Sequence, residues 1–263
     1  MSDRAEAGEA LAADPARSGL VLDFDGVLAP IAADPTTCAL PVRVAASLRR
    51  LASRLALVAI ISGRPVAFLA ERVGLPGVPL LGSYGMEQSI DGVRQIDPAA
   101  EKWLGPVQIA GRTLRERLAQ SAGVRVEEKS VSVAVHWRQA PDHAAAAAEV
   151  RRITAQLAHD LGLRLEPGKL VEELRPPIDV DKGSAISALL TGHPDLAVLA
   201  YAGDDLGDLP ALRAARDAGG YALVIDHGPE TDPRLLELAD ETFPGTAAFA
   251  DWLGTLADKV DPV

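Results

Sequence analysis

The 263-residue sequence has few of the residues that would mark several large classes of protein. It contains one cysteine, Cys38, so no disulfide framework can form within the chain, which agrees with a reducing compartment. Basic residues are scarce: 26 Lys and Arg stand against 37 Asp and Glu, and the formal net charge is −11. General binding to nucleic acid or to an anionic membrane needs a basic surface, so we expect neither as a partner.

Aromatic residues and long apolar stretches are also scarce. Phe, Trp and Tyr make up 4% of the chain, so Ala, Val and Leu must fill its core. The sequence has no run of about 18 or more apolar residues, which argues against a membrane-spanning helix. Residues 1–18 are acidic, rich in Ala and without the apolar segment of a signal peptide, so we expect a mobile leader and a cytoplasmic protein.

Four short apolar runs without alternation are typical of strands that are buried on both faces of a parallel sheet. They cover residues 19–24, 55–61, 196–202 and 221–225. Helical stretches follow the first two runs, and this alternation of strand and helix predicts an α/β fold with right-handed crossovers. Asp91-Gly92, between short apolar pieces, predicts a hairpin turn.

The pattern changes in the middle of the chain. Residues 130–138 alternate strictly between apolar and polar, which predicts an antiparallel strand with one solvated face. A long helix should follow, capped by Asp142 and ended by Gly162, and another strand is expected over residues 169–175.

These changes predict two domains. A core with a parallel sheet, formed by residues 19–98 and 178–263, is interrupted by a small α+β cap over residues 99–177. The length of the chain is sufficient for two domains of this size.

Polar clusters follow three of the predicted buried strands. They are Asp23 with Asp25, Ser62 with Arg64, and Asp204 with Asp205 and Asp208. Ligands bind at the carboxyl ends of the strands in open α/β sheets, so these side chains should converge in one crevice. Alone, Asp23-x-Asp25 is also typical of a capped turn, and Ser62 of a helix N-cap. The combination favours a functional site.

Five acidic side chains in one crevice would repel each other unless a cation joins them or protons stay bound. Oxygen ligands without nearby pairs of Cys or His favour Mg²⁺ over zinc. We predict Asp23, Asp25 and Asp204 as metal ligands, with the backbone carbonyl of Asp25 as an alternative to its side chain. Asp205 and Asp208 are predicted to support the metal site from outside the ligand set.

Lys182, which precedes a predicted helix, adds a cation to this set, although taken alone it is typical of a surface lysine. A hydroxyl, a lysine, a metal and paired acids together describe a phosphate site, in which Ser62 and Lys182 hold phosphoryl oxygens. Phosphate-monoester hydrolysis can need acceleration of up to about 10²¹-fold, and a covalent aspartyl phosphate divides that step in two. Asp23 as nucleophile and Asp25 as general acid and base fit these roles.

These motifs resemble those of the haloacid dehalogenase (HAD) superfamily, and they occur in the same order. The matching residues are Asp23–Leu28, Ser62, Lys182 and Gly203–Asp205. The resemblance implies a Rossmann-like parallel-sheet core with an inserted cap, Mg²⁺ as cofactor and an aspartyl-phosphate intermediate.

The cap narrows the resemblance to the trehalose-6-phosphate phosphatase family, whose motifs look like Glu127–Arg138 and Pro167–Gly183. It implies hydrolysis of trehalose 6-phosphate, a phosphorylated disaccharide, to trehalose and phosphate in trehalose biosynthesis. It leaves open an association with a trehalose-phosphate synthase, which the sequence does not reveal. The expected substrate-binding residues are Arg64, Glu127, Lys129, His136, Arg138, Lys169 and Glu173.

Strand parity supports part of this set. His136 and Arg138 share one face of the alternating strand, but Glu127 and Lys129 have the opposite parity. They need either a bend near Ser130 or a different role. The whole region is also compatible with a solvated polar sheet face.

Several positions depart from the family pattern, among them Val27 in place of a Thr and Trp137 in place of a Tyr. Gly207 and Leu209 replace the family's Thr and Glu, and Tyr84 replaces a His. The three aspartates near the metal remain, so we expect metal binding to survive. Two alternatives stay open: a phosphatase for another sugar or polyol phosphate, and a non-catalytic sugar-phosphate-binding subunit.

Overall fold

The computed structural model describes residues 5–31, 37–168 and 170–261. The chain divides into two compact units. Unit 1 consists of Met1–Gln95 and Val180–Val263, and unit 2 of Ile96–Asp179.

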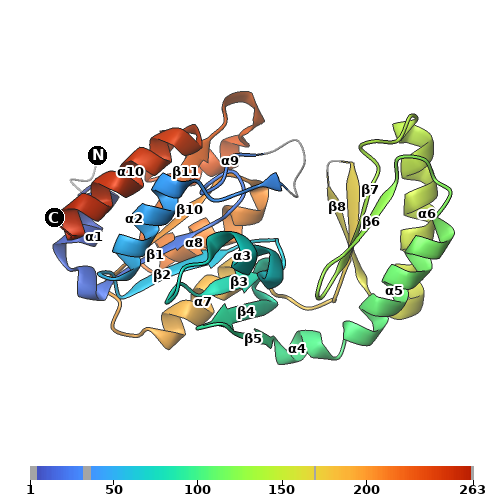
Figure 1. The fold of residues 1–263 in the computed structure, drawn as a ribbon, viewed down its shortest axis with the longest axis horizontal. Helices are drawn as coiled ribbons and strands as arrows, with labels where there is room; N and C mark the ends of the chain where they lie inside the picture. The colour runs from blue at the N-terminus through green and yellow to red at the C-terminus, as the bar shows by residue number, and fades with distance from the viewer. Residues whose placement is uncertain (1–4, 32–36, 169, 262–263) are drawn as a thin grey trace. The chain divides into compact units, whose positions relative to one another are not determined.

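Unit 1 is built on an eight-stranded sheet in the order β12-β11-β10-β1-β2-β3-β4-β5 (Figure 1). Neighbouring strands from β12 to β3 are parallel, and β4 runs antiparallel to β3. The predicted α/β class with a parallel sheet is therefore confirmed. The strands are β1 (Ser18–Leu22), β2 (Leu57–Ile61), β3 (Leu80–Gly82), β4 (Glu87–Ile90), β5 (Val93–Ile96), β10 (Val198–Gly203), β11 (Tyr221–Asp226) and β12 (Glu241–Pro244).

Helices cover both faces of this sheet, so successive residues of its central strands enter different cores. Leu20 and Leu22 of β1 pack in one core, and Val21 packs in the other. This double burial explains why the apolar runs do not alternate. The first core takes α1 (Ala7–Ala13), α2 (Val42–Ala52), α3 (Val66–Val73) and α10 (Gly245–Val260); the second takes α7 (Lys182–Gly192), α8 (Leu209–Asp217) and α9 (Pro233–Leu238).

The predicted hairpin turn lies between β4 and β5. Asp91 and Gly92 have φ angles of 50° and 79°. Two successive positive φ values are what a type I′ turn requires, and Asp-Gly is one of the residue pairs that adopt them readily.

The N-terminal segment differs from the mobile leader that its composition predicts. Residues 7–13 form α1, and Ala7 and Leu11 are fully buried in the first core. These two residues are four apart, so they share one face of the helix. Two apolar residues one helical turn apart are too short a pattern to predict a buried helix in an Ala-rich, acidic segment. Residues 1–4 lie outside the described part of the chain.

Unit 2 contains a four-stranded antiparallel sheet in the order β6-β7-β9-β8, with α5 (Leu104–Arg117) and α6 (His143–Leu161) against one face. Val133, Val135 and Leu174 share the core with these helices. The side chain of Asp142 accepts hydrogen bonds from Ala144 N and Ala145 N, and Gly162 ends α6 with a φ of 67°, so both predicted caps are confirmed. The strands are β6 (Arg125–Glu128), β7 (Val133–His136), β8 (Arg164–Gly168) and β9 (Val171–Arg175), and the short α4 (Pro98–Glu101) precedes α5.

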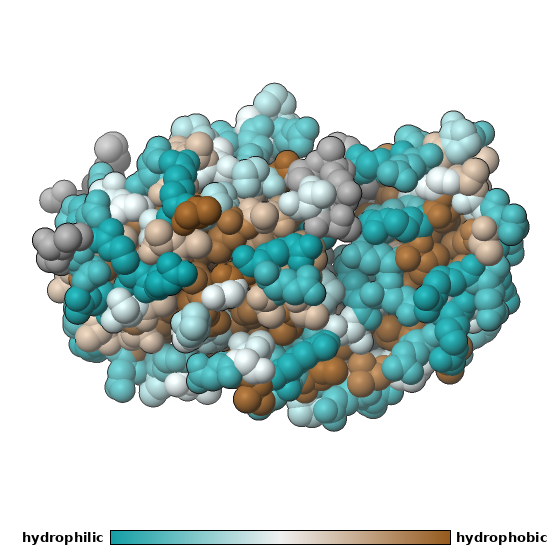
Figure 2. Space-filling model, viewed as in Figure 1, coloured by the Kyte–Doolittle hydropathy of each residue, from teal (hydrophilic) through white to brown (hydrophobic). Residues whose placement is uncertain are grey.

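In the part of the chain that the structure describes, no helix combines the length and the apolar character needed to cross a bilayer. On the face drawn in Figure 2, hydrophilic residues cover much of each unit, with apolar residues between them.

The burial of α1 gives a testable prediction. Leu11→Ala should lower the free energy of unfolding by about 2–5 kcal/mol, because it removes a fully buried side chain and leaves a cavity. Leu236→Ala is the matched control, since Leu236 is 41% exposed, and should cost less than about 1 kcal/mol. Urea denaturation measures both. Equal, small effects would show that residues 7–13 do not pack on the core.

Candidate active site

Three neighbouring strands of unit 1 bring the predicted polar clusters together. Asp23 follows β1, Ser62 follows β2 and Asp204 follows β10, and these strands are adjacent and parallel. Asp23 N continues the ladder by donating to Ala202 O at 3.0 Å. The convergence at the carboxyl edge of the sheet follows from this arrangement.

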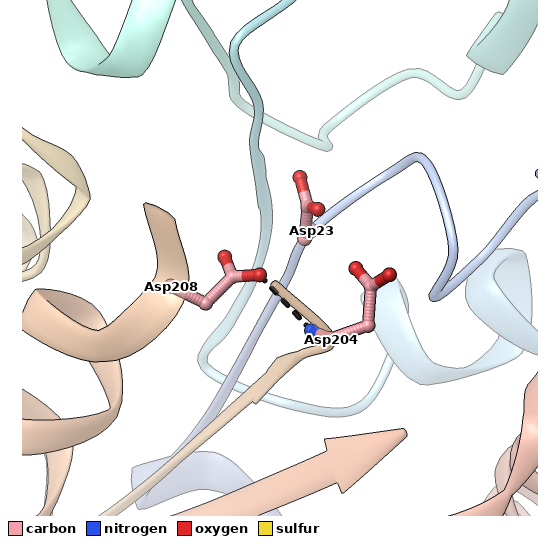
Figure 3. Close-up of side chains that lie close together, drawn as sticks. All are labelled: Asp23, Asp204 and Asp208. Carbon is pink, nitrogen blue, oxygen red and sulfur yellow. Dashed lines mark hydrogen bonds between the residues drawn. The ribbon is translucent and has the colours of Figure 1, made fainter. Parts of the chain in front are cut away.

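Asp23, Asp204 and Asp208 form a compact acidic cluster (Figure 3). One carboxylate oxygen from each lies within 4.8 Å of the others. The side chains of Asp23 and Asp208 are 6% and 0% exposed, so solvent does little to screen their repulsion.

Lys182 compensates part of this charge. Its Nζ lies 2.9 Å from Asp23 Oδ1 and 2.6 Å from Asp208 Oδ1, and its side chain is 3% exposed. Burial acts to lower the pKa of Lys182, but the Asp208 and Asp23 carboxylates outweigh it and raise that pKa above the ordinary value. The lysine is therefore a fixed cation inside the site, and its interpretation as a surface residue is wrong.

Asp208 uses both carboxylate oxygens to hold this arrangement. Oδ1 accepts from Lys182 Nζ and from the Tyr201 hydroxyl at 2.5 Å. Oδ2 accepts from the backbone N–H groups of Asp204 and Asp205 at 3.0 and 3.1 Å. Burial would raise the pKa of Asp208, but Lys182 and these hydrogen bonds lower it. Asp208 is thus an ionised support for the neighbouring carboxylates.

Asp23 and Asp204 have carboxyl groups that this network does not saturate. Burial and nearby carboxylates raise the pKa of Asp204 to about 9, and burial raises that of Asp23. The contact of Asp23 Oδ1 with Lys182 lacks hydrogen-bond geometry, so within the described residues this buried oxygen accepts no hydrogen bond. Oxygen donors with unmet charge and unused lone pairs fit a hard divalent cation.

Asp25 is turned to a different partner. Its carboxylate makes a bidentate pair with the Arg64 guanidinium, with Nε–Oδ2 and Nη2–Oδ1 distances of 2.7 and 2.9 Å. The sequence analysis predicted the Asp25 side chain as a metal ligand beside Asp23 and Asp204. In the structure, the third carboxylate of the cluster is that of Asp208. The prediction that the Asp25 backbone carbonyl serves as the ligand stays a prediction. Arg64 itself stacks on Phe68, with Cζ 4.6 Å from the ring centroid.

Ser62 and Asp205 occupy the expected loops. Ser62 is buried, and its Oγ accepts from Arg64 N at 3.2 Å. Asp205 Oδ1 accepts from Gly207 N at 2.8 Å, so its side chain caps the short helical turn Leu206–Asp208.

The sequence analysis included Gly26 in the first motif without a role for it, and it did not find His227. Gly26 has a φ of 76°, and a Cβ there would lie 2.1 Å from Asp204 Oδ2, so glycine is required for the close approach. His227 Nε2 lies 3.0 Å from Gly26 O and 3.4 Å from Asp204 Oδ2. His227 directly follows β11, so the strand-end rule that identified Asp204 could also have found it.

Unit 2 presents a polar sheet face opposite to its helices. Glu127 pairs with Ala134, which pairs with Glu173, and His136 lies two residues further along β7. Residues opposite each other in an antiparallel sheet, and those two apart, share a face. The chain reverses between β6 and β7, so the bend near Ser130, one of the two alternatives, brings Glu127 onto the face of His136.

This face is connected by charged hydrogen bonds. His136 Nε2 lies 2.8 Å from Glu127 Oε2, and Lys129 Nζ lies 3.0 Å from Glu173 Oε1. The Ser132 hydroxyl also donates to Glu173. The hydrogen bond with His136 lowers the pKa of Glu127 to about 2. Arg138 is exposed just after β7, and Lys169 lies outside the described residues.

The parallel sheet with its inserted α+β unit gives the chain a HAD-like fold, with a cluster of aspartates at the carboxyl edge of the sheet. Comparison with known proteins supports a narrower assignment. A sequence model described as trehalose-phosphatase matches residues 21–233. The chain belongs to the trehalose-phosphatase family.

Three known proteins illustrate the similarity. The trehalose-phosphate phosphatase of Mycobacterium marinum is 36% identical over 250 residues, which cover 93% of this chain and 62% of the relative. This chain therefore spans less than two thirds of that curated relative. The crystal structure of a trehalose-6-phosphate phosphatase related protein has a TM-score of 0.78 at 22% identity, covering 91% of this chain and 96% of its own. The C-terminal domain of Candida albicans trehalose-6-phosphate phosphatase gives 0.74 at 22% identity, with 97% of each chain covered.

The Glu127–His136 pair predicts a pH dependence. A lowered pKa in the folded state stabilises the protein above the unfolded pKa, near 4.3, and this contribution disappears as the pH falls toward about 2. Between pH 5 and 3, the wild type should lose about 1–2 kcal/mol more stability than Glu127→Gln. Urea unfolding at each pH measures this, and Glu237→Gln, at an exposed position, is the control. Parallel curves for wild type and Glu127→Gln would contradict the pairing.

Proposed function

We propose that this chain is a Mg²⁺-dependent phosphatase that hydrolyses trehalose 6-phosphate to trehalose and phosphate. The observation that carries the proposal is the buried Lys182 between Asp23 and Asp208, with Asp204 beside them. The family assignment and the oxygen-rich donor set support the same conclusion.

Asp23 is the nucleophile in the proposed reaction. Its carboxylate attacks phosphorus, the bond from phosphorus to the sugar oxygen breaks, and an aspartyl phosphate forms on Asp23. Lys182 and Ser62 hold the phosphoryl oxygens as charge develops on them. A water molecule then attacks phosphorus, which releases phosphate and restores the Asp23 carboxylate.

Asp25 moves the protons in both steps. As an acid it donates a proton to the departing sugar oxygen, and as a base it takes one from the attacking water. Its bidentate pair with Arg64 fixes the direction of the carboxyl group in the structure described above. Arg64 must release at least one of these oxygens when Asp25 acts as an acid, and a phosphoryl oxygen is a suitable new partner for the guanidinium.

Asp23, Asp204 and the Asp25 carbonyl would hold the Mg²⁺, with Asp205 and Asp208 as outer support. Bound there, the ion would neutralise charge on the carboxylates and on the transferring phosphoryl group. The raised pKa of Asp204 indicates that the metal-free site keeps a proton that the cation would displace.

The polar face of unit 2 would bind the sugar. Glu127, Lys129, His136 and Glu173 offer both donors and acceptors, and Arg138 and Lys169 complete the proposed set. Hydroxyl groups need both kinds of partner, and a site built for them rejects compounds that leave its groups unpaired.

We also keep the cytoplasmic location as a prediction.

The direct test is phosphate release from a panel of sugar phosphates, with Mg²⁺ and with EDTA. The proposal predicts release from trehalose 6-phosphate at least tenfold faster than from other members, and loss of release in EDTA. Preference for another sugar or polyol phosphate would contradict the substrate but keep the chemistry. Binding without any release would favour the non-catalytic alternative.

The role of unit 2 gives a second prediction. Lys129→Ala or Glu173→Ala should raise KM for trehalose 6-phosphate at least tenfold, because each removes a proposed contact with the sugar and breaks the Lys129–Glu173 ion pair. The KM for a small aryl phosphate should change less than twofold. Steady-state kinetics on both substrates checks this, and equal effects on the two would contradict sugar binding by this face.

A further inference from the structure

Glu87 is a fully buried carboxylate in unit 1 with no part in the chemistry proposed above. It begins β4, and its side chain is 0% exposed. Oε2 accepts from Arg94 Nε and Nη2 at 3.1 and 2.6 Å. Oε1 accepts from Val66 N at 3.1 Å and from the Ser83 hydroxyl at 2.8 Å. Arg94 compensates the negative charge of the carboxylate. The two hydrogen bonds to Oε1 connect Glu87 to two other segments, one at Val66 and one at Ser83.

The bond from Val66 reaches the start of α3. Val66 is the first residue of this helix, and Pro65 at the N-cap has no side-chain acceptor. The first N–H groups of a helix lack partners within it, and a negative charge is favourable at that end. The side chain of Glu87, which belongs to strand β4, therefore caps the N-terminus of α3. The loop just before this helix carries Ser62 and Arg64.

The bond from Ser83 reaches a strained turn. Ser83 and Tyr84 have φ angles of 51° and 64°, and non-glycine residues keep such values only where the surroundings hold them. Ser83 N donates to Arg64 O at 2.8 Å, and Tyr84 N donates to Ser62 O at 2.9 Å. The turn thus binds the backbone of Ser62 and Arg64, two of the residues proposed to contact the phosphoryl group.

Close packing joins the two segments. A Cβ at Gly82 would lie 2.5 Å from Val66 N, and one at Gly63 would lie 2.8 Å from Tyr84 Cζ. A small shift of the turn would therefore move the loop as well.

We propose that Glu87 is a positioning residue for the phosphoryl-binding loop. Its carboxylate holds the N-terminus of α3 and the turn Ser83–Gly85 together, and through them it fixes Ser62 and Arg64. This inference rests on the proposed function, in which those two residues act on the phosphoryl group.

The test compares Glu87→Gln with the matched control Gln88→Ala. Gln88 is the next residue of β4, and its side chain bonds only across the exposed hairpin to Gln95 in the contacts that the structure gives it. We expect Glu87→Gln to weaken binding of inorganic phosphate at least tenfold by calorimetry, and to lower kcat/KM equally for trehalose 6-phosphate and an aryl phosphate. Gln88→Ala should stay within twofold of the wild type in each measurement.

A double-mutant cycle separates positioning from simple stabilisation. In an Arg64→Ala background, Glu87→Gln should lower kcat/KM by a clearly smaller factor than in the wild type, because the loop has already lost one of the two side chains that Glu87 positions. Fully multiplicative effects, or a Glu87→Gln protein with wild-type phosphate binding and kinetics, would overturn the inference. If Glu87→Gln does not fold, Ser83→Ala removes one bond only and should still weaken phosphate binding at least threefold; unchanged binding would overturn it.

The wild type separates the two proposals. Phosphate release by the wild type together with an unaffected Glu87→Gln would refute only the role of Glu87. Absence of both phosphate binding and release in the wild type would refute the proposed function, and the positioning role with it.

Discussion

The pairing of buried Lys182 with Asp23 and Asp208 is the interaction on which the rest of the site depends. Taking three charged groups out of water costs several kcal/mol for each, and short contacts among all three offset that cost. Lys182 begins α7, immediately after the chain leaves unit 2, whereas Asp23 follows the first strand of unit 1. These ion pairs therefore join segments that are far apart in the sequence. They can form only if the chain, after unit 2, re-enters unit 1 with Lys182 beside the end of β1.

The same cluster holds more negative charge than one lysine can neutralise. Both carboxylate oxygens of Asp208 accept hydrogen bonds, from Lys182, Tyr201 and two backbone N–H groups. The uncompensated negative charge of the cluster is therefore that of Asp23 and Asp204. Burial raises the pKa of both, which favours protons in the metal-free protein and a divalent cation when one is present. With a divalent cation bound there, a net charge of −11 would be compatible with a phosphate substrate, because the cation and Lys182 act at short range and the distant charge is screened.

The sequence predicted those parts of the molecule that follow from local pattern. Runs buried on both faces identified the central strands, and the strand-end rule placed Asp23, Ser62 and Asp204 at one edge. The sequence could not predict strands β6 and β8, because their segments RVEE and RLEPG are short, charged and without a clear period of apolar residues. Nor could it predict that Asp25 pairs with Arg64, or that Glu87 caps α3. These contacts join distant segments and depend on rotamers that no local pattern encodes.

Trapping of the covalent intermediate tests the central claim most directly. The protein would be mixed with Mg²⁺ and trehalose 6-phosphate, quenched during turnover and treated with borohydride, which reduces an acyl phosphate to an alcohol. Peptide mass spectrometry should then find homoserine at position 23, and only when substrate and Mg²⁺ are both present. Turnover that yields no homoserine, or yields it at position 25, would contradict Asp23 as the nucleophile.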